Sequence, residues 1–295
     1  VLTLCAYRDN EVNESHPFIT TIKEIEDTNK RVARIQIKNL SEKDVQDLLL
    51  DSIKLNASEI APLSKLVFQK TLGNAFFVAQ FLKSLYTSEL LYFDFKRLHW
   101  CWDIDKIMNK NITDNVVELL AENILQLNKE TQHALKMAAC IGNTFDIETL
   151  VVILESNEQK VKEQLWEALS QDFIVPFDEK YKFSHDRVQQ AVYTLIPKSN
   201  REQTHLSIGK LLEANYDNHD NDFLLFDITN HLNKGIALLK SREEKISLAK
   251  LNERAARKAM ASSAFKIAYG YVKTGVSLLS KNAWTSNYEL NLSLH

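Results

Sequence analysis

A histidine–aspartate pair, His185-Asp186, lies in the run FSHDRVQQAVYTLIP, where an extended segment changes into an amphipathic helix. Backbone N–H groups at a helix start favour nearby anions, and a histidine at such a junction can direct its ring away from its own domain. The pair therefore suits recognition of a phosphate group. From these residues alone an alternative stays open, in which Asp186 caps the helix and His185 fills a packing seam.

A second candidate ligand-binding group is Arg8, which follows the apolar, strand-like run VLTLCAY at residues 1–7. Open α/β sheets place ligand-contacting side chains at the carboxyl ends of their strands. Arg8 and the polar residues after it would then face a ligand, although an ordinary polar turn would show the same residue types. The run VARIQIK at residues 32–38 alternates apolar and polar residues and predicts one more strand.

The bulk composition is that of a globular protein. The 295 residues are 45% hydrophobic and 25% charged, with a formal net charge of -3. This predicts about two domains and gives no reason to expect nucleic acid or an anionic membrane as a partner. No apolar run approaches the roughly 18 residues of a membrane-spanning helix, and no signal-peptide pattern begins the chain.

Cysteine and glycine usage narrow the class further. Cys5, Cys101 and Cys140 lack the spacing of a metal site or of a disulfide framework, so we predict no metal and a reducing, cytoplasmic location. With only six glycines and four prolines, the chain should be rich in helices with short connections. Because it opens at Val1 within a strand-like run, we expect it to be an excerpt of a longer polypeptide.

Helical periodicity covers most of the first hundred residues after the strand-like runs. Ser41 and Asp44 resemble a capping box, and Gly73-Asn74 are residue types that readily take a left-handed helix cap. The segments LLYFDF and RLHWCWD alternate as a hairpin, whose aromatic side chains we expect to pack across the strands. The predicted helices run over 18–27, from Ser41 to Ile53, and over 59–71 and 75–86.

The order of elements after Asn109 is that of a winged helix. Helices are predicted from Thr113, over 129–141, from Asp146 to Glu155 and, with a Ser156 capping box, over 157–171, and the strands FIVPF and KYKF follow. The 157–171 helix mixes acidic and basic residues, which does not suit a DNA-reading helix. After Pro197 the predicted helices cover 201–216, 223–239, 242–260 and 262–279, with the small-residue spacing of an α-solenoid.

Taken in order, AYRDNEV, LGNAFFVAQFL, the tryptophan-rich hairpin, ITDNVVELL, AACIGNTFD and FSHDRVQQAVYTLIP resemble the signal-transduction ATPases with numerous domains, a branch of the AAA-related P-loop NTPases. More closely, the chain is similar to the ATPase segment of large bacterial sensor proteins. That segment lies between a serine/threonine-kinase-like domain and GAF and histidine-kinase modules. The likeness covers nearly the whole chain.

The resemblance implies a mainly α fold in four parts. These are the C-terminal edge of a P-loop α/β ATPase core (1–38), a helical lid with a β-hairpin (39–108), a winged helix (109–197) and TPR-like α-solenoid helices (198–295).

The resemblance also implies roles for six residues. Arg8 would be a sensor arginine that contacts the γ-phosphate, a role that suits the fixed fork of a guanidinium. The turn Gly73-Asn74-Ala75 would match a Gly-x-Pro turn that packs on adenine, with Ala75 in place of the family proline. His185 would hold the β-phosphate of ADP, and Asp186 would orient the helix start.

The chain has no GxxxxGK motif followed by Ser or Thr, so we do not expect it to be an active ATPase alone. The resemblance implies a segment switched by ATP and ADP with Mg²⁺, whose ligands lie mostly outside this sequence. Its partners would be the kinase, GAF and histidine-kinase modules of the same polypeptide, proteins bound by the helical repeats, and further copies in a nucleotide-dependent oligomer. The alternatives are a non-catalytic interaction scaffold and a winged-helix transcriptional regulator.

Overall fold

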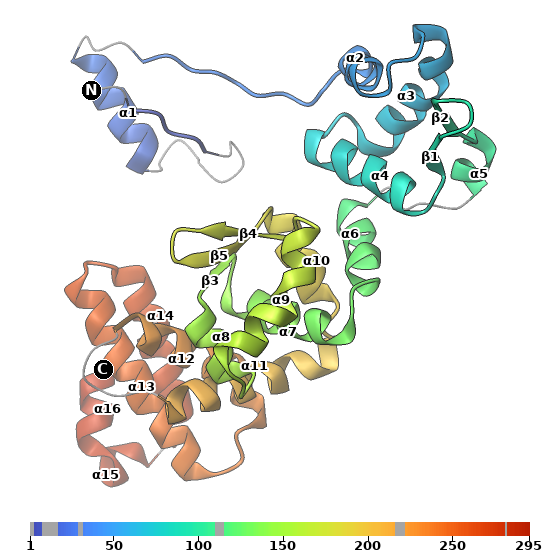
Figure 1. The fold of residues 1–295 in the computed structure, drawn as a ribbon. Coiled ribbons are helices and arrows are strands. Elements are labelled where there is room, and N and C mark those ends of the chain that lie inside the picture. The colour runs from blue at the N-terminus through green and yellow to red at the C-terminus, as the bar shows by residue number, and fades with distance from the viewer. Residues whose placement is uncertain (1–2, 8–16, 29–31, 110–114, 216–221, 281) are drawn as a thin grey trace.

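The computed structural model describes residues 3–7, 17–28, 32–109, 115–215, 222–280 and 282–295, and it is mainly helical, as the sequence predicts. Helix α1 (Pro17–Asp27) has no buried residue and stands apart from the remaining helices, to which an extended segment joins it (Figure 1).

The two strands predicted near the N-terminus are wrong in the described residues. Residues 3–7 and 32–38 form no strand, and their side chains are largely exposed, as Leu4, Ile35 and Ile37 show. A β-strand needs a neighbouring strand to satisfy its backbone groups, and no described segment pairs with either run. Strand propensity alone therefore does not build a sheet here.

We call residues 42–109 the hairpin unit. It comprises α2 (Glu42–Ile53), α3 (Ala57–Thr71), α4 (Ala75–Thr87), β1 (Leu91–Asp94), β2 (His99–Trp102) and α5 (Ile104–Asn109). The predicted Ser41–Asp44 capping box is present. Phe93 lies opposite Trp100 with the ring centroids 5.7 Å apart, so the aromatic side chains of the hairpin pack as predicted.

We call residues 115–195 the central unit. It comprises α6 (Val116–Leu125), α7 (Lys129–Ile141), β3 (Thr144–Phe145), α8 (Ile147–Ile153), α9 (Glu158–Ser170), β4 (Ile174–Phe177), β5 (Lys180–Phe183) and α10 (Asp186–Thr194). The antiparallel strands have the order β3-β5-β4. Strand β3 was not predicted, because two residues are too short to show an alternating pattern.

Two predicted helix caps need correction. Asn157, not Ser156, caps α9, because its side chain accepts from Lys160 N at 2.9 Å. Asn115 caps α6 through Val117 N, while Thr113, the predicted cap, lies outside the described residues. At the start of α9, Asn157 is therefore the acceptor for the first free N–H groups.

Helix α6 joins the hairpin unit to the central unit. It packs against both α4 and α10, and Val116 contacts the apolar cores of the two units. Figure 1 shows α6 between the two groups of helices. Apolar packing of α6 on each unit therefore adds to the covalent link between them.

The helical tail, residues 198–295, comprises α11 (Lys198–Ala214), α12 (Asp222–Lys234), a 3-10 turn (Ile236–Leu238), α13 (Arg242–Ala261), α14 (Phe265–Leu278), α15 (Ala283–Ser286) and α16 (Tyr288–Leu294). Helix α11 packs on α12 and α13 on α14. Cys140 and Ile153 of the central unit, together with Ile196 between the two units, complete the core of the tail. Within the described residues, no helix combines the length and apolarity that a membrane crossing needs.

A buried pair of histidines ties α11 to α12. His205 Nδ1 lies 2.9 Å from His231 Nδ1, and Tyr193 Oη lies 3.1 Å from His205 Nε2. Two facing Nδ1 atoms can share only one hydrogen, so one ring donates through Nδ1 and the other accepts. Burial, with Lys234 and Arg201 nearby, lowers the pKa of His205 from 6.5 to about 4, and burial beside His205 lowers the pKa of His231 to about 3.

These shifts predict acid sensitivity of the helical tail. Below about pH 6.5 the unfolded chain binds protons at both histidines while the folded chain does not, so the free energy of unfolding should fall as the pH drops from 6.5 toward 4. The free energy of unfolding can be measured by urea unfolding at several pH values in this range. Plotted against pH, it should change less steeply in the His205→Gln, His231→Gln double variant than in the wild type. The exposed His133→Gln is the control, and an unchanged slope in the double variant would contradict the prediction.

Candidate functional site

The turn between α3 and α4 is built on a glycine that no other residue replaces easily. Gly73 has a left-handed φ of 71°, and a Cβ at this position would lie 1.9 Å from Leu40 O. The backbones are this close because Leu40 N donates to Gly73 O at 2.8 Å. The segment before α2 is therefore fixed directly over the turn.

Asn74 has a different role from the one its type predicts. The left-handed positions are Leu72, with φ 49°, and Gly73, while Asn74 has φ −63° and is the N-cap of α4. Its Oδ1 accepts from Phe77 N at 3.0 Å. Ala75 is consequently the first residue of α4, the position where proline is best tolerated in a helix, so alanine there preserves the same helix start.

His185, rather than Asp186, caps α10. Its backbone is extended, and its Nδ1 accepts from Arg187 N at 3.0 Å and lies 2.8 Å from Asp186 Oδ1. This overturns the alternative in which Asp186 is the cap. Nδ1 makes one of these two contacts at a time, because a neutral ring accepts the Arg187 N–H there, whereas an imidazolium donates Nδ1–H to the carboxylate and gives up the cap.

The β-hairpin before α10 sets the position of His185. Phe183 N donates to Asn143 O at 2.9 Å, and Ser184 N donates to Phe173 O at 3.0 Å. About a third of each side chain of the pair is exposed, 34% for His185 and 35% for Asp186. The imidazole is thus anchored on its backbone side and reachable by solvent.

The structure brings the turn and the His-Asp pair together. The Phe76 ring, in the first turn of α4, stacks on the His185 imidazole with centroids 4.2 Å apart and planes 14° apart. The Gly73–Ala75 turn and the His185-Asp186 pair are therefore linked through Phe76, the residue that follows the turn. Arg8 lies outside the described residues.

Sequence reasoning missed Phe76. A contact between residues so far apart in the chain has no local pattern, and an aromatic side chain in the first turn of a helix is ordinarily assigned to that helix's own core. Neighbouring Phe77 follows that rule, since it is buried in the hairpin unit. Phe76 instead packs against the core of the central unit.

These residues fit the edge of a nucleotide rather than the whole of it. Asn74 and Ala75, the exposed residues of the turn, and a partly exposed imidazole at a helix start can contact a base and a phosphate oxygen. The described residues provide no glycine-rich phosphate loop, and no group of three or more His, Cys, Asp or Glu side chains among them is placed to hold a metal ion. A Mg²⁺ nucleotide would have to take its remaining ligands elsewhere.

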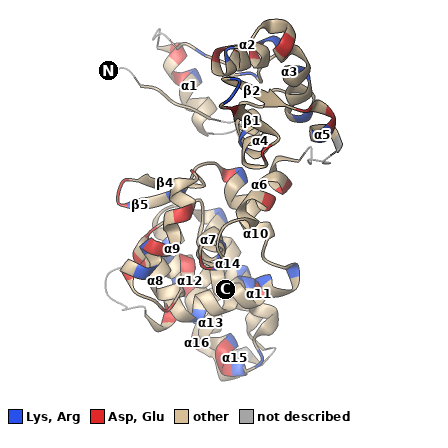
Figure 2. Cartoon of the chain, turned by 45° about the vertical axis from the view of Figure 1, so that its right-hand side comes forward, with Lys and Arg blue, Asp and Glu red and all other residues tan. Residues whose placement is uncertain are grey.

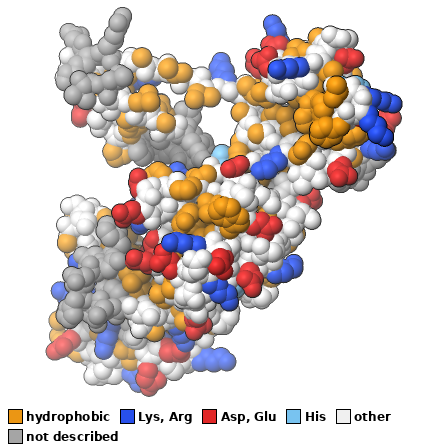
Figure 3. All heavy atoms as spheres, in the orientation of Figure 1, with side chains coloured by type: hydrophobic (Ala, Val, Ile, Leu, Met, Phe, Trp, Pro, Cys, Tyr) orange, Lys and Arg blue, Asp and Glu red, His pale blue; other side chains and the backbone are white. Residues whose placement is uncertain are grey.

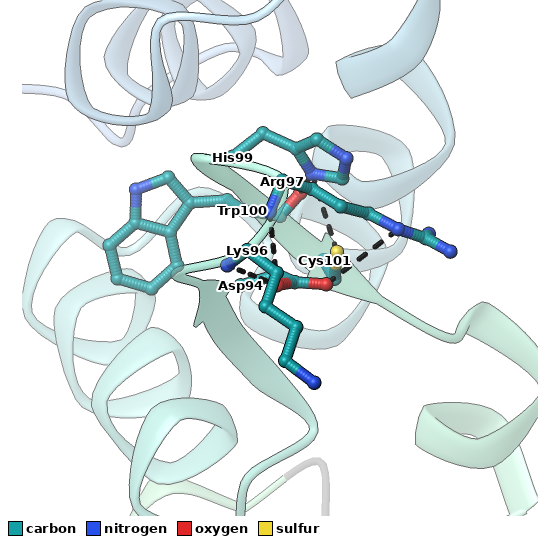
Figure 4. Close-up of polar contacts among 6 residues, drawn as sticks. All are labelled: Asp94, Lys96, Arg97, His99, Trp100 and Cys101. Carbon is teal, nitrogen blue, oxygen red and sulfur yellow. Dashed lines mark hydrogen bonds and ion pairs between the residues drawn. The ribbon is translucent and has the colours of Figure 1, made fainter.

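A second polar cluster lies at the tip of the β1–β2 hairpin (Figure 4). Asp94 accepts from the backbone N–H groups of Lys96 and Arg97 at 2.8 and 3.2 Å, which holds the pKa of its carboxyl below the usual value. His99 Nδ1 lies 3.0 Å from Trp100 O and 3.3 Å from Cys101 Sγ. The Asp94 contacts close the turn between the strands, and we assign this cluster to hairpin structure.

Helix α9 carries charges of both signs (Figure 2). Lys162 pairs with Glu158, and Glu167 accepts from Asn128 N at 2.9 Å. The aromatic residue of this helix, Trp166, has 71% of its surface exposed. Exposed apolar side chains also gather over the hairpin unit (Figure 3). The exposed large apolar residues of that unit include Leu72, Tyr86, Phe95 and Leu98.

The sequence of this chain is similar to segments of signalling kinases. No protein-family profile matches it. It is 30% identical over 357 aligned residues to hybrid signal transduction histidine kinase G of Dictyostelium discoideum, covering 100% of this chain and 10% of that protein. It is 23% identical over 239 residues to peroxide stress-activated histidine kinase mak3 of Schizosaccharomyces pombe, covering 79% of this chain and 10% of that protein.

The chain thus spans about a tenth of the length of the curated relatives it matches. Among solved structures it is similar to the crystal structure of a signal transduction ATPase with numerous domains, with a tetratricopeptide repeat sensor, from Pyrococcus horikoshii. The TM-score is 0.42 and the identity 14%, over 84% of this chain and 35% of that one.

The closeness of Gly73 to Leu40 predicts the effect of a single methyl group. Gly73→Ala should lower the local free energy of unfolding around the turn by at least about 2 kcal/mol, because the new Cβ meets a carbonyl oxygen and φ stays left-handed. Hydrogen exchange of the α3 and α4 amides would measure this.

The matched control for this prediction is Gly270→Ala. A Cβ at Gly270 meets nothing within 4 Å, and alanine is favoured inside a helix by about 1 kcal/mol. If the α3 and α4 amides are equally protected from hydrogen exchange in Gly73→Ala and in the wild type, the close contact with Leu40 does not stabilise the turn.

Proposed function

We propose that this chain is a nucleotide-controlled regulatory segment of a multidomain signalling protein of the histidine-kinase class. The single observation that carries the proposal is the meeting of the Gly73–Ala75 turn with the His185-Asp186 helix start through Phe76. Similarity along the full chain to a segment of a hybrid histidine kinase supports the signalling context.

In this proposal each group contacts one part of the nucleotide. The exposed turn at Ala75 borders the adenine, and His185 donates through Nε2 to the β-phosphate of ADP. Asp186, 2.8 Å from Nδ1, stabilises the imidazolium that an adjacent phosphate favours. Arg8 contacts the γ-phosphate. Bound Mg²⁺ would neutralise phosphate charge, through ligands elsewhere in the protein.

The switch would follow from charge. ADP presents its terminal phosphate to His185, whereas ATP adds a γ-phosphate for Arg8. The two states would alter how the central unit sits on the upstream ATPase core, and the helical tail, which shares its core with the central unit, would pass this change to attached kinase and GAF modules. We place this activity in the cytoplasm, with nucleotide-dependent oligomerisation as one form of output.

A second candidate function is a non-catalytic scaffold, and the helical tail supplies the observation that favours it. An open groove of about 690 Å³ lies between α12, α13 and α14, with Phe226, Ile267 and Tyr271 beside the amides of Asn230 and Asn233. Such a surface could take an extended protein segment without any nucleotide. A DNA-binding regulator is disfavoured, because α9 mixes acidic and basic residues and its Lys162 is paired with Glu158.

Photolabelling of the full-length protein separates these functions, because it identifies the peptide that binds the nucleotide. A simple binding measurement would not, since kinase domains elsewhere in the protein could also bind nucleotide. We expect 8-azido-ADP to label the peptide that contains Ala75. Competition by ADP at this peptide should weaken at least about tenfold in His185→Ala, the loss of one charge-assisted hydrogen bond. Competition by ATP should change less, since Arg8 contributes in that state.

The control is His133→Ala, an exposed histidine on α7 of the same unit, which should leave both competition curves unchanged. Absence of label anywhere in residues 1–295 would favour the scaffold. Labelling with unchanged ADP competition in His185→Ala would remove His185 from the site while leaving nucleotide binding in place.

A further inference from the structure

We propose that Phe76 is the positioning residue of the phosphate site: it holds the His185 ring in place and makes affinity for the nucleoside diphosphate depend on docking of the hairpin unit against the central unit. This inference rests on the proposed function. It concerns a residue from a different part of the chain, whose ring contacts the imidazole face rather than the ligand.

The stack and the helix start hold the imidazole on one face and along one edge. One face lies on Phe76 at 4.2 Å, and the Nδ1 edge meets Arg187 N at 3.0 Å and Asp186 Oδ1 at 2.8 Å. A ligand phosphate would therefore be contacted through Nε2. A partly exposed histidine otherwise loses rotamer freedom when it binds a ligand, and a ring held beforehand avoids that loss.

The same face of α4 makes a second contact with the central unit. Lys83 Nζ donates to Gln171 O, the carbonyl just after α9, at 2.7 Å. Lys83 lies seven residues after Phe76, which is two helical turns and thus the same side of α4. Phe76 also packs against the core of the central unit. The stack is therefore one end of a docked surface rather than an isolated side-chain encounter.

Docking and phosphate binding are coupled through this ring. A phosphate at Nε2 favours the imidazolium, and a cation over an aromatic face is attracted more strongly than a neutral ring. By linkage, the factor by which docking tightens diphosphate binding equals the factor by which the diphosphate tightens docking. An aromatic stack corresponds to about a 3- to 10-fold change in an equilibrium constant.

The first test measures the stack without nucleotide. In the 295-residue chain with isotope-labelled histidine, Phe76 should shield the ring protons of His185, and His185→Gln identifies that signal. Phe76→Leu, which keeps apolar volume but has no ring face, should move the signal downfield, and Phe76→Tyr should retain it. Tyr86→Leu is the matched control, because Tyr86 lies on α4 but contacts Trp100 inside the hairpin unit.

The second test measures coupling in the full-length protein, by ADP and ATP competition for 8-azido-ADP labelling of the Ala75 peptide. Phe76→Leu should weaken ADP competition about 3- to 10-fold and ATP competition by less, with Phe76→Tyr restoring it and Tyr86→Leu unchanged. Lys83→Met should act in the same direction as Phe76→Leu, since it removes a further contact between α4 and the central unit.

The outcomes separate this inference from the proposed function. If ADP competition depends on His185 but Phe76→Leu leaves it unchanged, Phe76 is not a positioning residue and the nucleotide switch stands. If no peptide of this chain is labelled, the nucleotide proposal fails, and coupling through Phe76 fails with it even where the His185 signal reports the stack. If Phe76→Leu leaves the His185 signal in place, the stack is absent in solution and the inference is overturned.

Discussion

The parallel contact between Phe76 and His185 is the interaction on which the candidate site depends. It joins the first turn of α4 to the start of α10, two helix starts from separately packed units. Without it the turn and the imidazole would belong to different surfaces. Each partner is itself fixed by a local device, the Asn74 cap on one side and the His185 cap on the other.

Local backbone geometry decides where these groups can point. Gly73 must be glycine because Leu40 O occupies the space of a side chain, and this contact ties the segment before α2 to the turn. The turn then delivers Ala75 at the first helical position, where alanine and proline share a compatible backbone. Alanine instead of proline at this position therefore changes the side-chain surface and leaves the helix start intact.

Buried apolar contacts join the central unit to both of its neighbours. The hairpin unit meets the central unit through α6, Phe76 and Lys83, and Leu119 of α6 is buried in the core of the hairpin unit. The core of the helical tail includes Cys140 and Ile153 of the central unit, beside the buried pair of histidines. Because close-packed interiors transmit strain, the central unit is mechanically linked to the units on either side of it.

The sequence by itself determined the helical character, the hairpins, most helix boundaries and the residue types of the turn and the His-Asp pair, because periodicity and capping are local. Only the tertiary structure decided that His185 rather than Asp186 caps α10, that Asn74 opens a helix, and that Phe76 serves the neighbouring unit. The predicted strand at residues 32–38 is wrong for the same reason: a strand exists only where another segment completes its hydrogen bonds, and no local pattern contains that partner.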